Sequence, residues 1–225
     1  MAEYVKEWIP VRYAESEMGE QGILRGGDKT KIIPISFTLY VLKTDSHCVL
    51  VDAGCDELDG FEMRNMLGPV KALENQGIST EEITDVIITH AHDDHIAGID
   101  HFPRTRVYIQ EDEYIYGQKF IPKNNEVITF KEECTVAGCL KLKKIGGHSI
   151  GSCIVEFSMD DERYIVCGDE CYSSECFWKK VPTGVSVCPE KSQKFIEEYG
   201  NGDYKILMCH DFQEGVVCLP KKEED

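Results

Sequence analysis

Residues 83–95 read Ile83-Thr84-Asp85-Val86-Ile87-Ile88-Thr89-His90-Ala91-His92-Asp93-Asp94-His95. The first part of this stretch is apolar and β-branched, which predicts a buried strand over 83–89. Three histidines and two aspartates follow at once, although the whole chain has only seven histidines. Packing does not explain such a density, and the carboxyl end of a strand is where α/β proteins place ligand sites. The stretch therefore predicts a functional site at a strand end.

The residue types in this loop indicate metal binding. In an extended segment His90 and His92 point to the same side, whereas Asp94 and His95 turn toward a neighbouring position. Neutral imidazole and carboxylate are ligands that suit zinc, iron, manganese or cobalt. The alternative is a polar turn whose histidines only satisfy backbone groups, and the clustering disfavours it. We therefore expect one short loop to serve two adjacent cations.

Three further candidates follow apparent strands later in the chain. They are His148 in Gly-Gly-His-Ser, Asp169 in Cys-Gly-Asp-Glu and His210 in Met-Cys-His-Asp. Glycines beside the first two permit sharp turns and close backbone approach. Each pattern is weak alone, but together they suit one dinuclear centre. His47, in a predicted hairpin turn, and His101, before Phe-Pro, are interpreted as ordinary loop residues.

The rest of the chain mixes strands with helices. We predict strands over 4–12, 35–43, 48–53, 106–109, 127–128, 139–143, 153–157, 164–167 and 205–209. Helices are predicted from Pro69 to Gly77, from Glu111 and from Pro189, because proline suits the first helical position and glycine the end. The polar, glycine-rich segment Glu15–Lys31 is predicted to be a long surface loop. The pattern favours a layered α/β architecture with two sheets.

The length and the net charge of the chain exclude several classes of function. A chain of 225 residues, 42% of them hydrophobic, predicts a single globular domain over residues 1–225. It has 24 basic and 41 acidic residues, a net charge of −17, which disfavours nucleic acid and anionic membranes as partners. Neither an apolar leader nor a spanning segment is evident, so we expect a cytoplasmic protein with a small-molecule substrate. These features leave the oligomeric state open.

Cysteine is frequent but follows no metal or redox spacing. The eleven cysteines are an odd number and are scattered through predicted strands, without a C-x-x-C pair. We interpret them as reduced, largely buried thiols and disfavour a second, cysteine-based metal site.

The segment Thr89–Gly98 resembles the HxHxDH signature of the metallo-β-lactamase superfamily. Upstream Asp52-Ala53-Gly54 is similar to the lead-in of that family, and His148, Asp169 and His210 follow in the family's order. The resemblance implies an αβ/βα four-layer sandwich, in which two mixed sheets are flanked by helices. It also implies metals at the sheet edges between the two halves.

The resemblance implies a ligand set and its cofactor. One metal would take His90, His92 and His148, the other Asp94, His95 and His210, and Asp169 would bind both. The cofactor would be two divalent metal ions per chain, zinc first, with iron, manganese or cobalt as alternatives. Asp52 would orient a ligand histidine, and Asp211 is a weaker candidate for that role.

Within the superfamily the chain most resembles the N-acyl homoserine lactonases. Asp169-Glu170-Cys171-Tyr172 resembles their bridging aspartate followed by an active-site tyrosine. The resemblance implies that a metal-bridging hydroxide attacks a lactone or related ester. Tyr172 would polarise the carbonyl, and Asp94 would carry a proton to the leaving alkoxide. Two positions depart from the lactonase pattern, since Asp93 replaces an apolar residue and Ile150 a proline.

The superfamily that the chain resembles also includes other functions. A thioesterase of the glyoxalase II type would use the same ligands but is expected to add a helical domain beyond His210. A nuclease is disfavoured by the charge, and a flavodiiron-type protein would carry glutamate at His92. A non-catalytic metal-binding protein is the remaining alternative. It is disfavoured because such a descendant tends to lose ligands, and all seven positions are filled.

Overall fold

The strands form two six-stranded sheets. The computed structural model describes residues 3–212 and 217–219. The first sheet has the order β1 (Glu7–Gly19), β2 (Ile32–Lys43), β3 (Cys48–Val51), β4 (Asp85–Ile88), β5 (Arg106–Gln110) and β6 (Glu126–Phe130). The second has the order β12 (Val217–Cys218), β11 (Lys205–Leu207), β10 (Glu162–Val166), β9 (Cys153–Met159), β8 (Leu140–Lys144) and β7 (Glu133–Val136). Both sheets contain parallel and antiparallel pairs.

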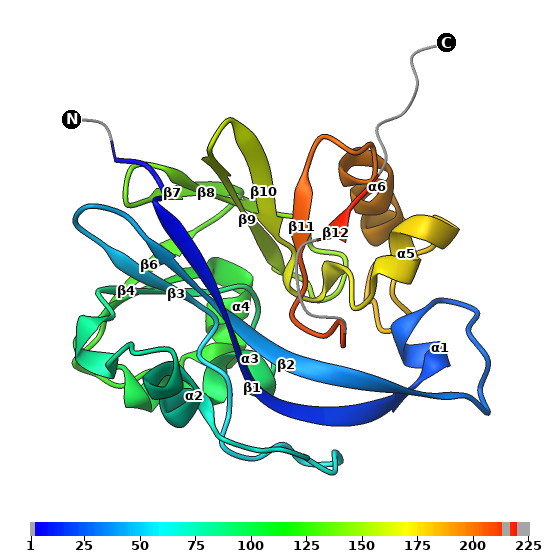
Figure 1. Cartoon of the computed structure of the whole chain (residues 1–225), viewed down its shortest axis with the longest axis horizontal. Coiled ribbons are helices and arrows are strands. Elements are labelled where there is room, and N and C mark those ends of the chain that lie inside the picture. Colours follow the sequence, from blue (N-terminus) through cyan, green and yellow to red (C-terminus); the bar gives the residue numbers. More distant parts are fainter. Residues whose placement is uncertain (1–2, 213–216, 220–225) are drawn as a thin grey trace.

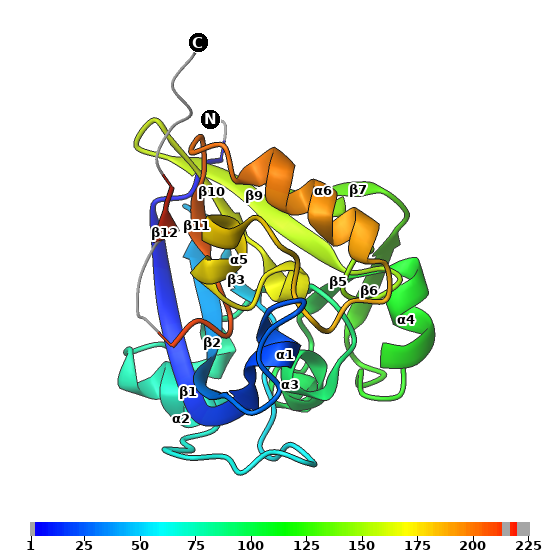
Figure 2. The same cartoon turned by 90° about the vertical axis from the view of Figure 1, so that its right-hand side faces the viewer.

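Helices flank the two sheets. The α-helices are α1 (Glu20–Ile23), α2 (Pro69–Asn75), α3 (Asp93–Ile96), α4 (Glu111–Gly117), α5 (Ser174–Lys179) and α6 (Pro189–Tyr199). Short 3₁₀ turns are η1 (Thr80–Glu82), η2 (Ala97–His101) and η3 (Gly168–Glu170). Figure 1 shows α2 at the lower left and α5 with α6 at the right, and Figure 2 shows α5 and α6 on the outside of the second sheet. This is the four-layer αβ/βα sandwich that the resemblance implied.

Strand β4, which precedes the histidine motif, is buried on both faces. In β4, Ile87 belongs to the core between the two sheets, together with Val155 of the second sheet. Its neighbours Val86 and Ile88 belong to the core that contains Leu73 of α2. A strand covered on both sides takes apolar residues on both faces, which is why Val86, Ile87 and Ile88 follow one another without a polar residue.

The direction of the strands gathers the polar loops. Strands β3, β4 and β5 are parallel in the first sheet, and β10 and β11 are parallel in the second. Their carboxyl ends therefore lie at common edges. Asp52 follows β3, His90 follows β4, Asp169 follows β10 and His210 follows β11. The topology brings residues far apart in the sequence to one place.

The prediction of a long surface loop over Glu15–Lys31 is wrong. Strand β1 continues to Gly19 and pairs with β2, with Glu15 opposite Ser36 and Gly19 opposite Ile32. The tip forms α1, which Figure 2 shows beside the α5–α6 connection. The ladder uses backbone groups, so polar side chains do not prevent it when a partner strand is present. Only the tip around 24–31 lacks helix and strand.

The predicted helix starts are confirmed, since α2 begins at Pro69, α4 at Glu111 and α6 at Pro189. Strand β7 and the short helix α5 were not predicted, because elements of four to six residues leave little periodicity.

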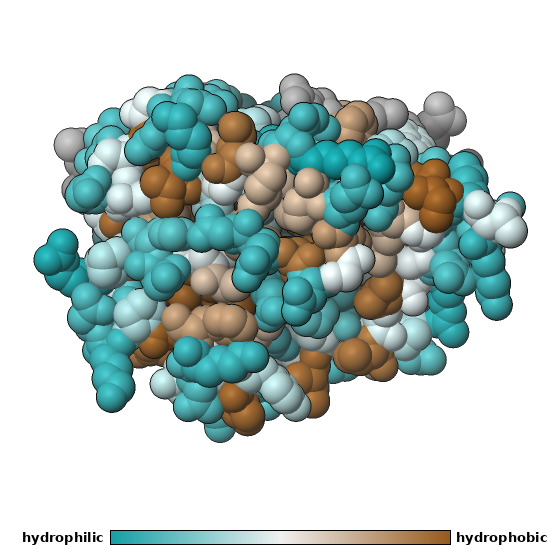
Figure 3. Space-filling model, turned by 90° about the horizontal axis from the view of Figure 1, so that it is seen from below, coloured by the Kyte–Doolittle hydropathy of each residue, from teal (hydrophilic) through white to brown (hydrophobic). Residues whose placement is uncertain are grey.

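No helix within the described ranges has the length and apolarity to cross a membrane. Figure 3 shows hydrophilic residues interspersed with separate hydrophobic patches on one face.

Candidate metal centre

Two groups of metal-ligating side chains meet where the sheets converge. The first contains His90, His92, His148 and Asp169, and the second contains Asp94, His95, Asp169 and His210. Within each group the donor atoms lie within 4.8 Å of one another, and Asp169 belongs to both. The fold thus brings together all seven residues that the resemblance implied as ligands.

The local backbone explains why the ligands between His90 and His95 divide between the two groups. His90 and His92 lie in the loop that follows β4, and the backbone of His92 is extended (φ −75°, ψ 151°). Helix α3 then begins at Asp93, so Asp94 and His95 lie in a helical turn and face the second group. This is the change of direction that the spacing predicted.

The first group is a convergence of imidazole nitrogens. His92 Nδ1 lies 3.0 Å from His90 Nε2 and 2.9 Å from His148 Nε2. Asp169 Oδ2 lies 3.6 Å from His90 Nε2 and 3.4 Å from His148 Nε2. Three ring nitrogens and one carboxylate oxygen around a common point form the donor set of a tetrahedral cation such as zinc.

The second group centres on the other oxygen of the same aspartate. Asp169 Oδ1 lies 3.1 Å from His95 Nε2 and 3.1 Å from His210 Nε2. Asp94 Oδ2 lies 3.5 Å and 3.4 Å from the same two nitrogens. His95 Nε2 and Asp169 Oδ1 are buried without a hydrogen-bond partner among the described residues. A bound cation would satisfy both atoms, so the residues fit the implied metals.

Asp52 orients one of these histidines. Its Oδ2 lies 2.7 Å from His95 Nδ1, and its Oδ1 accepts a hydrogen bond of 2.7 Å from the backbone N–H of Thr89. Because the carboxylate accepts the Nδ1 proton, His95 Nε2 is left to face the centre. This is the placement expected for Asp52.

Backbone carbonyl groups orient two other histidines of the centre. His148 Nδ1 donates to the carbonyl of Val185 at 2.7 Å, and His210 Nδ1 donates to that of Ser36 at 2.9 Å. Their Nε2 atoms also remain available as ligands. The sequence carries no sign of either partner, since every residue has a carbonyl. Ser36 lies in β2, so the first sheet positions a histidine that follows a strand of the second.

The pKa values of the histidines differ between the two groups. Burial lowers the pKa of His90 and of His148, which favours neutral, ligand-competent rings. For His210 burial acts in the same direction, but the Asp169 carboxylate outweighs it and raises the pKa to about 10. The pKa of His95 is likewise raised against burial, by Asp169 and then Asp52. In the metal-free chain these histidines hold protons that cations would replace.

Glu170 braces the loop that carries His148, and sequence reasoning missed it. It is fully buried, and its Oε1 accepts hydrogen bonds from the backbone N–H groups of Gly147 at 3.0 Å and His148 at 3.2 Å. Its Oε2 accepts from Ser192 Oγ at 3.1 Å. A Cβ on Gly147 would lie 2.4 Å from Glu170 Oε2, so the loop needs glycine there.

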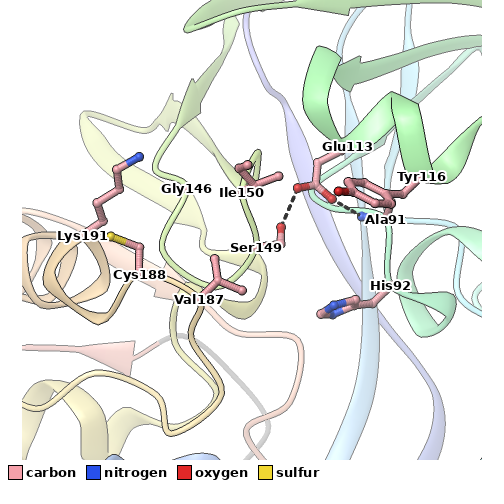
Figure 4. Close-up of a pocket in the computed structure, with 10 residues that line it drawn as sticks. All are labelled: Ala91, His92, Glu113, Tyr116, Gly146, Ser149, Ile150, Val187, Cys188 and Lys191. Carbon is pink, nitrogen blue, oxygen red and sulfur yellow. Dashed lines mark hydrogen bonds between the residues drawn. The ribbon is translucent and has the colours of Figure 1, made fainter.

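Glu113 braces the same loop from the first sheet's side. Its Oε1 accepts from Ser149 Oγ at 2.7 Å and from the backbone N–H of Gly151 at 2.7 Å. Its Oε2 accepts from the N–H of Ala91 at 2.8 Å, between the first two histidines of the motif. Figure 4 shows this side chain between the two loops. In the sequence, Glu113 is visible only as an acidic residue three positions after Gln110. No local pattern indicates the groups, distant in the sequence, from which it accepts hydrogen bonds.

Tyr172 lies against the centre. Its ring centroid is 4.9 Å from that of His210 and 5.7 Å from that of His148. Burial, reinforced by the charges of Asp169 and Asp94, raises the pKa of its hydroxyl well above the usual value, so the group is a hydrogen-bond donor.

The remaining candidates have other surroundings. The Asp211 carboxylate accepts a 2.8 Å hydrogen bond from the N–H of Ser174, at the start of α5. His47 Nδ1 lies 2.8 Å from Asp85 and His101 Nε2 lies 2.7 Å from Asp56, and neither histidine belongs to the two groups. All eleven cysteines are free thiols.

Two curated relatives match parts of the chain. Hydroxyacylglutathione hydrolase of Photobacterium profundum is 30% identical over 146 residues, which are 63% of this chain and 49% of that protein. N-acyl homoserine lactonase AiiB of Agrobacterium fabrum is 24% identical over 106 residues, which are 40% of this chain and 38% of that protein. The chain thus matches about half, or less, of the length of these relatives.

The fold also matches solved structures. One is an N-acyl homoserine lactone hydrolase with the product N-hexanoyl-L-homoserine bound at its catalytic metal centre, at a TM-score of 0.80 and 21% identity, covering 93% of this chain and 94% of that one. In sequence, residues 36–194 match the metallo-beta-lactamase superfamily, a span that runs from β2 into α6 and includes six of the seven candidate ligands. The chain therefore belongs to the metallo-β-lactamase superfamily.

Proposed function

We propose that the protein is a dinuclear metal-dependent hydrolase that opens lactones resembling N-acyl homoserine lactones, or related ester bonds. The observation that carries this proposal is the position of Asp169 between the two groups. Its Oδ2 faces His90 and His148, and its Oδ1 faces His95 and His210. A carboxylate shared in this way suits two cations held side by side.

The proposed ligands are the seven residues of the two groups, and zinc is the first choice because of their imidazole and carboxylate donors. Two bound divalent cations would supply Lewis acidity and bring the pKa of a bound water close to neutral. Tyr172 would donate its hydroxyl proton to the developing oxyanion. Asp94 faces His95 and His210 through Oδ2, so its other oxygen is available to carry a proton to the leaving alkoxide.

Thioester hydrolysis is the second candidate. It is favoured by the 30% identity to hydroxyacylglutathione hydrolase, which exceeds the 24% identity to the lactonase. The same ligands and the same proton carrier would serve a thioester, whose thiolate leaves more readily than an alkoxide. A non-catalytic metal-binding role is disfavoured because the histidines are oriented as well as present.

The proposal is tested by metal analysis combined with a substrate panel. We expect purified, metal-replete protein to hold about two transition-metal ions per chain, to hydrolyse lactones, and to lose both properties with a chelator. Asp169→Ala should reduce metal content, whereas Asp93→Ala, at an exposed neighbour outside both groups, should not. Saturation at one ion would contradict the shared carboxylate. A kcat/KM higher for thioesters than for lactones would select the second candidate.

A further inference from the structure

A cavity of about 650 Å³ lies beside the metal centre. It is bounded by the loop after β4, by α4, by the β8–β9 loop and by the start of α6, and Figure 4 shows its lining. His92 lines it and is the one exposed histidine of the two groups. A substrate bound at the centre therefore has room on this side of His92.

The walls of the cavity are apolar side chains that remain uncovered. Tyr116 is 63% exposed, Ile150 is 55% exposed and Val187 is 68% exposed, and all three line the cavity. Apolar surface left in water is unfavourable relative to apolar surface that is buried. Such side chains gathered around a concave site favour binding of an apolar group. Ile150 is also one of the two positions that depart from the lactonase pattern.

Two charged side chains, Glu113 and Lys191, line the cavity. Glu113 is 3% exposed and accepts three hydrogen bonds, so its charge is compensated by the two loops that it braces. Lys191 is exposed and takes part in none of the ion pairs found within 3–212 and 217–219. Among the described residues, Lys191 is therefore the cation that lines the cavity without an ion pair.

The position of that cation is defined by a glycine. A Cβ on Gly146 would lie 3.1 Å from Lys191 Nζ, so the ammonium rests against the bare backbone of the cavity wall. Figure 4 shows Lys191 on the opposite side of the cavity from His92, with Ile150 and Val187 between them. Lys144 approaches the same glycine but is paired with Asp112 at 2.7 Å. On a chain with a net charge of −17, most of the surface repels anions, so the ammonium of Lys191 favours an anionic group at this point.

We propose that this cavity binds the acyl part of the substrate, and that this part is an apolar chain ending in a carboxylate that pairs with Lys191. The inference rests on the proposed hydrolase function and specifies its substrate class. The carbonyl carbon lies at the metal centre, the methylene chain contacts Ile150 and Val187, and the terminal carboxylate reaches the ammonium.

The first experiment compares matched esters on the metal-loaded protein. We would measure kcat/KM for p-nitrophenyl half-esters of the dicarboxylic acids from succinic to suberic, and for neutral p-nitrophenyl alkanoates of equal length. At the chain length that spans the cavity, the wild type should prefer the half-ester. Lys191→Gln should reduce that preference about three-fold, the size typical of an exposed ion pair. Lys194→Gln, on the same helix but lining a different cavity, should retain it.

An unchanged preference in Lys191→Gln, or a wild type that prefers the neutral ester at every length, would overturn the proposal. The apolar wall has its own variant, Val187→Ser, which should flatten the rise of kcat/KM with chain length. Because Val187 is largely exposed, this change should leave folding intact. If kcat/KM rises with chain length as steeply in Val187→Ser as in the wild type, the methylene chain of the substrate does not bind in this cavity.

A binding measurement separates this inference from the hydrolase proposal. The Tm of metal-loaded protein would be followed with dicarboxylates and with monocarboxylates of the same length. If no ester is hydrolysed, the hydrolase proposal fails. A larger Tm shift with the dicarboxylate that disappears in Lys191→Gln would still support the cavity assignment. Equal shifts with both acids would overturn it.

Discussion

Asp52 holds His95 through a 2.7 Å contact between its Oδ2 and His95 Nδ1. Asp52 has a φ of 63°, a left-handed conformation that costs a residue with a Cβ of the order of 1 kcal/mol or more. The conformation is retained because the carboxylate simultaneously bonds Thr89, at the end of β4. Strand β3 thereby places a negative charge behind a histidine that follows β4.

The relationship predicts a metal-specific defect in Asp52→Ala. Without the carboxylate, His95 loses its fixed orientation and its partner, so we expect metal affinity to fall about 10- to 100-fold. Chelator-competition titration would measure it. Asp56→Ala is the matched control, because Asp56 contacts His101 at the same 2.7 Å but on the surface. Equal affinities for the Asp52 variant and the wild type would show that Asp52 only shapes the turn.

Glu170 provides a second prediction, for the loop that carries His148. Glu170→Ala leaves the buried N–H groups of Gly147 and His148 without an acceptor, which should cost about 1–3 kcal/mol of unfolding free energy. Urea denaturation of the metal-free protein would detect the loss. Metal binding to the first group should weaken as well.

A surface glutamate serves as the control for that experiment. Glu198 forms an exposed ion pair with Lys143, and Glu198→Ala should change stability by less than about 1 kcal/mol. If the Glu170 and Glu198 variants unfold at the same urea concentration, the hydrogen bonds of Glu170 contribute nothing net to stability.

Tyr172→Phe should separate catalysis from metal binding. The ring packs against His148 and His210, and phenylalanine preserves that contact. We expect metal content to stay at the wild-type level while kcat on the best lactone falls about 100-fold, as for the loss of one oxyanion donor. A rise in KM alone would make Tyr172 part of the pocket wall. Full activity would remove it from the mechanism.

The docking of the β1–β2 tip predicts a stability effect far from the chemistry. A Cβ on Gly184 would lie 1.8 Å from the carbonyl oxygen of Gln21, so Gly184→Ala must separate α1 from the α5–α6 connection. We expect a lower Tm and faster proteolysis within 19–31. At Gly19 the nearest atom would be 3.8 Å away, and Gly19→Ala should behave as wild type. Equal Tm values for the two variants would show that the tip is not held there.

Much of the metal centre could be predicted from the sequence, because the pattern that specifies it lies within a few neighbouring residues. The motif from His90 to His95 follows an apolar strand directly, and the side on which each donor points depends on a few backbone angles. Helix starts at Pro69 and Pro189 were predictable for the same reason, since proline both presets φ and lacks the N–H that a first turn leaves unpaired.

The contacts that hold the donor side chains in place come from the tertiary structure. Glu113 and Glu170 accept from loops that are distant in sequence, and the carbonyls of Ser36 and Val185 orient two histidines. The extension of β1 into the predicted Glu15–Lys31 loop depended on its partner strand. Backbone carbonyls and amides are the same in every residue, so their pairing leaves no mark on composition or periodicity. The local sequence therefore specifies which side chains are available for the chemistry, and the packing of the two sheets supplies the groups that hold each of them in its orientation.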